Sequence, residues 1–177
     1  PRHITPELVA AHAELAVLPA HVHLPVQSGS DRVLRRMARR YTAEEYVART
    51  DALKKAKPGL TLSADFIVGF PGESEEDFQR TLELVRRVEF VAAFAFKYSP
   101  RPYTPALNLG DEVSEEVKDE RLARLFDLID SQQQAHLNSL VGRELEVLVE
   151  GPSPGDTGRF AGRSERNEIV HLIAPAG

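Results

Sequence analysis

The sequence predicts an α/β fold with parallel strands, followed by a small antiparallel β unit. Three strand-like runs each lead into a polar, turn-rich loop, at residues 21–30, 63–73 and 94–101. Helical patterns lie between them, and strands separated by helices imply right-handed parallel crossovers. After residue 140 the pattern changes to the short alternating runs of β-hairpins. We therefore expect two domains, residues 1–140 and 141–177.

The first helix and strand are placed by local signals. Thr5-Pro6-Glu7 offers a hydroxyl cap, a proline at the first helical position and an acid near the positive end of the dipole. Pro19 ends this helix, and residues 21–26 read as a short buried strand. Ser30-Asp31 then opens a second helix.

Two capping-box patterns place the next helices. One begins at residue 42 and stops at Pro58-Gly59, and the other begins at residue 74. Strands are expected at 60–68 and 91–98, and the proline-rich stretch 99–110 is irregular. The residues expected on inner helix faces are Leu8, Val9, His12, Leu15, Val33, Leu34, Met37, Tyr46, Val47, Thr50, Leu53, Phe78, Leu82, Val85 and Val88.

A long fifth helix is predicted from Ser114 to a C-cap at Gly142, with a stripe of Leu122, Leu125, Phe126 and Ile129. Beyond it, strand-like runs at 144–150, 158–163 and 168–173 flank a Gly/Pro/Ser/Asp turn at 151–158. This spacing is typical of an antiparallel hairpin unit.

Composition limits the functional classes. The chain has 177 residues, a net charge of −5 and no cysteine, so it holds no disulfide and no thiolate metal site of its own. The negative charge gives no global attraction to nucleic acid, so any RNA contact would use local patches. No apolar run approaches the roughly 20 residues that span a bilayer, and no signal peptide is visible. We expect a cytoplasmic protein without a membrane partner.

The three loops suggest one ligand site, because loops that follow parallel barrel strands gather on one face. Gln27, Ser28 and Ser30 offer donors and acceptors beside Gly29, where a ligand can approach the backbone closely. Asp65 and the bend at 69–72 add acceptors and exposed N–H groups. Phe96 and Tyr98 offer flat surface for an adenine. The alternative is a barrel whose loops are merely well capped.

Charged and imidazole side chains raise further possibilities. His21 and His23 lie two apart on a strand, a spacing that suits a metal, although packing or hydrogen bonding is favoured. Lys97 and Arg101 flank the expected site and can meet a substrate. Helical spacing gives a basic stripe that is either a solvated face or a phosphate contact; it comprises Arg32, Arg35, Arg36, Arg39 and Arg40. A weaker RNA-contact set in the second domain comprises Arg143, Arg159, Phe160, Arg163 and Arg166.

Several runs resemble one family. HVHLPVQSGSDRVLRRM, RRYTAEEY, LSADFIVGFPGESEEDF and FKYSPRPYTPA occur in order over residues 21–106. They resemble the later half of the radical S-adenosylmethionine barrel of methylthiotransferases, and most closely the MiaB-type enzymes that act on tRNA. Residues 141–151 and 158–164 resemble the start of a TRAM domain, a small OB-like β-barrel. The resemblance thus implies the second half of a radical-SAM-type barrel followed by a partial TRAM-like domain.

The resemblance implies an enzyme that uses S-adenosylmethionine and two 4Fe-4S clusters to insert sulfur at a C–H bond and then methylate it. The implied substrate is N6-isopentenyladenosine next to the anticodon, and the implied partners are the tRNA anticodon stem-loop and an electron donor; a monomer is expected. The cofactor-binding residues expected are Gln27, Ser28, Ser30, Asp65, Ile67, Gly69 and Tyr98. The substrate-binding residues expected are Lys97, Arg101, Arg32 and Arg36. None is assigned to catalysis or to a metal.

The sequence also departs from the family pattern. The cluster-ligating CxxxCxxC motif is absent, and iron–sulfur clusters are held by cysteine thiolates, so we expect a fragment that is inactive in isolation. Tyr103 stands where the family usually has glycine. The alternatives are a methylthiotransferase for threonylcarbamoyl-adenosine in tRNA, one for a ribosomal-protein aspartate, and a non-catalytic RNA-binding module.

Overall fold

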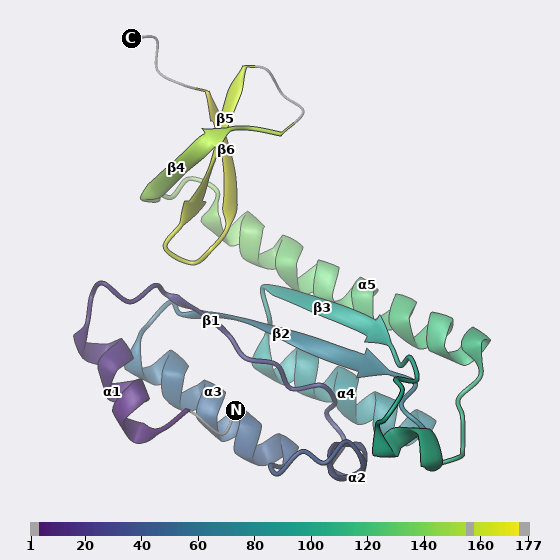
Figure 1. Cartoon of the computed structure of the whole chain (residues 1–177). Helices are drawn as coiled ribbons and strands as arrows, with labels where there is room; N and C mark the ends of the chain where they lie inside the picture. Colours follow the sequence, from purple (N-terminus) through teal and green to yellow (C-terminus); the bar gives the residue numbers. More distant parts are fainter. Residues whose placement is uncertain (1–3, 155–157, 174–177) are drawn as a thin grey trace.

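A parallel three-stranded sheet lies at the centre of the chain (Figure 1). The structure is a computed structural model that describes residues 4–154 and 158–173. The strands are β1 (His21–His23), β2 (Thr61–Val68) and β3 (Ala92–Lys97), in the order β1-β2-β3. Both pairings are parallel, as the crossovers predicted, with His21 opposite Thr61 and Ser63 opposite Ala92.

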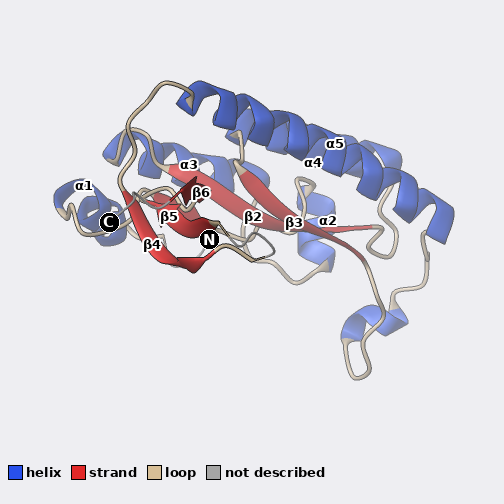
Figure 2. Cartoon of the chain, turned by 90° about the horizontal axis from the view of Figure 1, so that it is seen from above, coloured by secondary structure: helices blue, strands red, loops and turns tan. Residues whose placement is uncertain are grey.

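The helices cover one face of this sheet. They are α1 (Pro6–Glu14), α2 (Asp31–Arg36), α3 (Ala43–Ala56), α4 (Glu75–Val88) and α5 (Glu115–Leu140), with a short 3₁₀ turn η1 (Pro105–Asn108). Figure 2 shows α3, α4 and α5 on the same side of β2 and β3. The outward side chains of β2 are buried against them, because Leu62, Phe66 and Val68 are fully inaccessible to solvent.

The predicted capping signals are present. Side chains of Thr5, Ser30, Thr42, Ser74 and Ser114 each accept a hydrogen bond from a backbone N–H in the first turn of the following helix. The patterns beginning at residues 42 and 74 both form complete capping boxes. These local contacts satisfy N–H groups that a helix cannot satisfy itself, so the sequence alone fixes the five helix starts.

The opposite face of the sheet is largely open. Phe94 and Phe96 of β3 are 60% and 57% exposed there.

Two elements are shorter than the sequence predicted. β1 ends at His23 rather than at residue 26, and α1 ends at Glu14, well before Pro19. Leu15 is exposed as a result, since it lies beyond the helix that was expected to bury it.

The second sheet consists of β4 (Val147–Pro152), β5 (Arg159–Ser164) and β6 (Ile169–Ile173), paired antiparallel in that order. The predicted hairpin pattern is confirmed, and the centre of its first turn, at 155–157, lies outside the described residues. The turn before β6 contacts the amino ends of β1 and β2: Ala20 N–H donates to Glu165 O at 2.9 Å, and Thr61 Oγ1 donates to Arg166 O at 3.2 Å. The second sheet therefore lies at the end of the parallel sheet where its strands begin.

Candidate functional site

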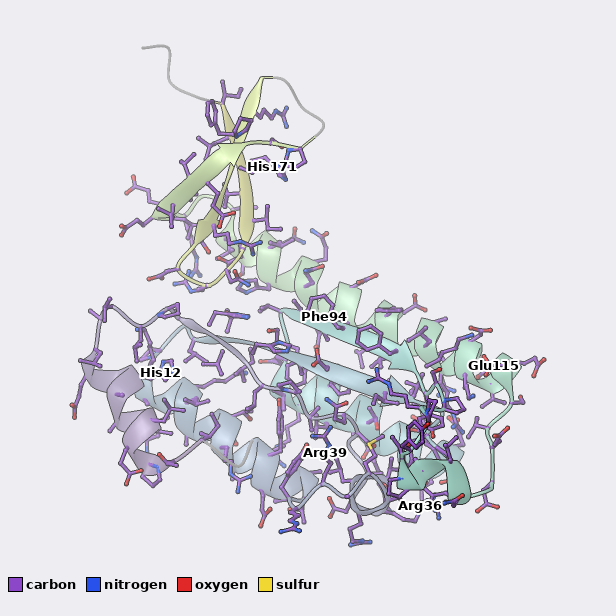
Figure 3. The ribbon with its side chains drawn as sticks, in the orientation of Figure 1. His12, Arg36, Arg39, Phe94, Glu115 and His171 are labelled. Atoms are coloured by element: carbon purple, nitrogen blue, oxygen red, sulfur yellow. The ribbon has the colours of Figure 1, made fainter. Side chains whose placement is uncertain are left out.

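A cavity of about 580 Å³ opens at the other end, where β2 and β3 finish. That size lies within the range of small-molecule sites. Figure 3 shows Arg36 and Arg39 at this end, far from His171 in the second sheet. The cavity is lined by Gln27, Arg36, Met37, Ala38, Arg39, Asp65, Ile67, Phe70, Phe96, Lys97, Tyr98, Ser99, Arg101, Thr104, Pro105 and Ala106.

Gln27 enters the site in an unusual backbone conformation. Its φ is +77°, in the left-handed region that costs an L-residue roughly 1–2 kcal/mol. Two hydrogen bonds hold it there: its N–H donates to Asp65 O at 2.8 Å, and its carbonyl accepts from Ile67 N–H at 2.9 Å. Gln27 thus extends the β1–β2 pairing beyond the end of β1, and this places it beside Asp65 and Ile67 at the cavity.

Tyr98 and Arg36 line the same cavity, and each has a buried donor atom that makes no hydrogen bond with the described residues. The Tyr98 ring packs edge-on against Phe70, with centroids 5.0 Å apart, and its hydroxyl is buried without a hydrogen-bond partner among the described residues. Arg36 Nε donates to Pro71 O at 3.1 Å, and its buried Nη2 makes no hydrogen bond but lies 3.9 Å from Asp111 Oδ2 as an ion pair. Buried donors are normally satisfied, so the Tyr98 hydroxyl has room for an acceptor supplied by a ligand or water.

Lys97 is paired with the start of α5. Its Nζ lies 2.8 Å from Asp119 Oδ1 and 3.0 Å from Glu115 Oε2, and these hydrogen bonds raise the pKa of Lys97, with Asp119 the larger cause. The lysine stays charged at neutral pH. A substrate contact from Lys97 would therefore have to compete with two carboxylates.

The structure places Ser28 and Ser30 away from the cavity. Both are fully buried. Ser28 Oγ lies 3.3 Å from Thr81 Oγ1, and Ser30 Oγ donates to Asp77 Oδ1 at 2.6 Å while capping α2. These contacts hold the loop against α4, and neither serine is among the residues that line the cavity.

Gly29 is required by packing. A Cβ at this position would lie 2.3 Å from Arg80 O and 2.6 Å from Thr81 Cα. Glycine therefore lets the loop pack against the backbone of α4.

Gly69 and Arg32 also lie outside the cavity lining. Gly69 has a φ of +69°, and a Cβ there would meet the side chain of Lys118 at 2.3 Å. Arg32 hydrogen-bonds the Asp77 carboxylate and the carbonyl of Gly72, so it ties α2 to the loop between β2 and α4.

A buried ionic network supports the site from behind. Burial raises the pKa of Asp77, but hydrogen bonds from Arg32, Ser30 and Ser74 outweigh it and hold that pKa far below its ordinary value. Glu73 accepts from Gly69 N–H at 2.7 Å and from Arg121 at 2.8 Å. This pair connects α5 to the turn that leaves β2.

The two histidines of β1 form a hydrogen-bonded row with β2. His21 contacts Thr61 Oγ1 and Ser63 Oγ, each at 2.9 Å, and His23 contacts the same Ser63 hydroxyl at 2.9 Å. Asp65 continues the row, with Oδ1 3.4 Å from His23 Nε2. The favoured reading of these histidines as hydrogen-bonded strand residues is confirmed.

Sequence reasoning missed part of the lining. Arg39, Met37 and Phe70 face the cavity although none was assigned to it. The chain turns back after α2 through Ala38, whose φ is +56°, and this turn presents Arg39. No sequence signal marks Ala38 as left-handed, because alanine has no preference for that region.

Comparisons with known proteins show what the chain is similar to. Residues 1–85 match the Radical SAM superfamily. The chain is 63% identical over 97% of its length to a tRNA-2-methylthio-N(6)-dimethylallyladenosine synthase of Sorangium cellulosum, and 48% identical over 97% to one of Acidithiobacillus ferrooxidans. It spans 36% and 38% of those curated relatives.

A solved structure agrees at the level of the fold. Coproporphyrinogen III oxidase (HemN) from Escherichia coli, a radical SAM enzyme, matches 89% of this chain and 46% of its own with a TM-score of 0.55 at 15% identity. At this identity the likeness shows the fold alone, while the match over residues 1–85 and the 63% identity make the chain similar to radical SAM proteins and to the tRNA methylthiotransferases among them.

Proposed function

We propose that this chain forms the cofactor- and substrate-binding part of a radical SAM enzyme that adds a methylthio group to N6-isopentenyladenosine in tRNA. One observation carries the proposal: seven of the eleven residues expected from sequence to bind cofactor or substrate line a single cavity. They are Gln27, Asp65, Ile67, Tyr98, Arg36, Lys97 and Arg101. The names of both relatives supply the reaction.

The cavity suits S-adenosylmethionine. Ile67, Phe70 and Phe96 give an apolar wall for the adenine, while the Tyr98 hydroxyl, which has no hydrogen-bond partner among the described residues, suits a ribose or carboxylate oxygen. When bound, S-adenosylmethionine supplies the radical chemistry and the methyl group. The residues of this chain bind it, orient it and keep water from it.

An iron–sulfur cluster does not fit these residues. The chain has no cysteine, and the described ranges contain no group of three or more His, Cys, Asp or Glu that could hold a metal. Cluster ligands of the complete protein would come from outside this chain, and we derive no step through a cluster. We expect no methylthiotransferase activity from the chain alone.

The RNA part of the proposal rests on local charge. The cavity is lined by the basic side chains of Arg39, Lys97 and Arg101, and Asp65 is the acidic residue in the same lining. Such a cluster can meet the phosphates of an anticodon stem-loop although the chain as a whole carries −5. The second sheet, as the start of a TRAM-like domain over residues 141–177, would add RNA contacts.

The remaining parts of the proposal concern the complete protein. We propose that the complete protein is a cytoplasmic monomer that receives electrons from a separate donor. None of the helices in the described parts of the chain is long and apolar enough to cross a membrane.

Calorimetry tests the cavity directly. In the complete protein that carries this chain, Ile67→Trp fills the adenine wall and should weaken binding of S-adenosylhomocysteine at least tenfold. Ile169→Trp makes the same change on the second sheet, where the isoleucine is exposed, and should leave binding unchanged. Equal affinity in both variants would remove the cavity from the cofactor site.

Nucleoside analysis tests the reaction. Expression of the complete gene in a host that lacks the modification should produce 2-methylthio-N6-isopentenyladenosine in its tRNA, measured by mass spectrometry. Methylthiolation of threonylcarbamoyl-adenosine, or of a ribosomal-protein aspartate, would support an alternative methylthiotransferase. RNA binding without any methylthio product would support the non-catalytic module.

A further inference from the structure

Tyr103 stands at the tip of a tight turn on the rim of the cavity. Arg101 and Thr104, on either side of it, both line the cavity. The Tyr103 side chain is completely exposed, and it makes no hydrogen bond or ring contact with any residue in the ranges that the structure describes. Folding of those residues therefore gains nothing from burying this ring.

The backbone of the turn disfavours tyrosine. Thr104 N–H and Oγ1 both donate to Arg101 O, at 3.3 and 2.8 Å, and so close a four-residue turn. Pro102 takes the second position, and Tyr103 takes the third with a φ of +65°. Proline followed by a positive φ is the pattern of a type II turn, in which glycine is the favoured third residue. The tyrosine is thus held in a strained conformation at a fully exposed position.

We infer that Tyr103 stacks on an unpaired base of the RNA loop whose target nucleotide enters the cavity. This inference rests on the proposed function. A base that leaves its stack to reach a cavity deprives its neighbour of a stacking partner, and an aromatic ring on the rim can replace it. The strained turn projects the ring into solvent, where a base can reach it.

The surroundings of the ring match this role. Phe96 adds an exposed aromatic surface within the cavity, and Arg101 and Lys97 provide cations for the adjoining phosphates. Aromatic rings interleaved with basic side chains are the usual means of holding single-stranded RNA. A purely electrostatic site would need the cations but not the tyrosine.

Substitution by glycine separates binding from folding. In the complete protein, Tyr103→Gly removes the ring and also relieves the positive φ, so thermal stability should stay equal or rise. Binding of a fluorescent RNA hairpin with an anticodon-type loop should weaken between about fivefold and about a hundredfold. Tyr103→Phe should bind like the wild type, because it keeps the ring. A fully paired RNA duplex of equal length should bind all three proteins alike.

Salt dependence separates stacking from charge. Tyr103→Gly should keep the wild-type slope of log affinity against log salt concentration, whereas Arg101→Ala should reduce that slope by about 0.7. Unchanged hairpin affinity in Tyr103→Gly, with tRNA modification intact in the wild type, would overturn this inference and leave the proposed function standing. A fall in the melting temperature of Tyr103→Gly would also overturn it, because the ring would then pack against another part of the complete protein. A wild type that neither binds the hairpin nor modifies tRNA would overturn both.

Discussion

Arg121 of α5 and Glu73, in the turn that follows β2, form a buried ion pair at the back of the candidate site. Arg121 Nη1 lies 2.8 Å from Glu73 Oε2, and the two side chains are only 5% and 1% exposed. Glu73 also accepts the N–H of Gly69. One carboxylate therefore joins the long helix to the turn that leads from β2 towards the cavity.

Removing Arg121 should destabilise the fold strongly. Arg121→Met leaves the Glu73 carboxylate buried and unpaired, and we expect a loss of about 3 kcal/mol in urea denaturation. Arg124→Met is the matched control: Arg124 also lies over the Phe78 ring, but its pair with Glu75 is largely exposed and should cost less than about 1 kcal/mol. Equal losses in the two variants would contradict the importance of the buried pair.

The cost of Arg121→Met should depend on pH. Burial already raises the pKa of Glu73, and losing Arg121 raises it further. A group whose pKa is raised by folding stabilises the native state at low pH and loses that contribution as pH rises through its folded pKa. The difference in unfolding free energy between wild type and Arg121→Met should therefore shrink as pH falls towards 4, and a difference independent of pH would contradict this.

Asp77 should have the opposite pH dependence. Burial raises its pKa, yet the donors Arg32, Ser30 and Ser74 hold it below its ordinary value. Its contribution to stability is thus present above the unfolded pKa, about 3.9, and is lost as pH falls below that value. Asp77→Asn should cost about 2 kcal/mol at pH 7 and flatten the acid limb of a denaturation series. A wild-type acid limb in this variant would show that the carboxylate stabilises nothing.

Ser30 and Gln27 were both expected to contact the cofactor. In the structure Gln27 lines the cavity, whereas Ser30 does not. Ser30→Ala removes the cap of α2 and a partner of Asp77, so it should cost about 1–2 kcal/mol of stability. Gln27→Gly suits the φ of +77° and should leave stability nearly unchanged while weakening S-adenosylhomocysteine binding. Calorimetry and denaturation on the same two variants check both, and full affinity in Gln27→Gly would remove its side chain from the site.

The attachment of the second sheet can be tested by hydrogen exchange. Glu168 Oε1 lies 2.7 Å from His136 Nε2, and Arg166 Nε donates to Gly59 O at 3.0 Å. Glu168→Ala with Arg166→Ala should speed exchange of the Ala20 amide, which donates to the same turn. Glu150→Ala, which removes an exposed pair with Arg163, should not. Unchanged exchange at Ala20 would mean that backbone contacts alone hold the sheet.

Local signals predicted most of the fold. Helix starts depend on residues three apart, so Ser74 and Asp77 identify α4 without any tertiary information. The end of α1 and the exposure of Phe126, at 37%, were not predictable in this way, since they depend on how far the neighbouring elements reach. Apolar spacing shows which side of a helix can be buried, not whether a partner covers all of it.

The candidate site was predictable only in part. The sequence predicted that Asp65, Ile67 and Tyr98 lie near one another, because the loops that follow parallel strands gather on one face, and all three line the cavity. Side-chain direction was not fixed: Ser28 and Ser30 follow β1 closely in sequence but turn into the packing against α4. Hydroxyl groups near a site serve the ligand or the loop, and only the tertiary contacts distinguish the two.

The opposite placement of the cavity and the second sheet sets a minimum length for any molecule that touches both. β2 has eight residues, and seven rises of about 3.3 Å give a separation of about 23 Å between its two ends. A free nucleoside is far too short to bridge that distance, whereas a folded RNA stem with its loop is long enough. The length of β2 thus means that a molecule touching both the cavity and the second sheet is an RNA rather than a single nucleoside.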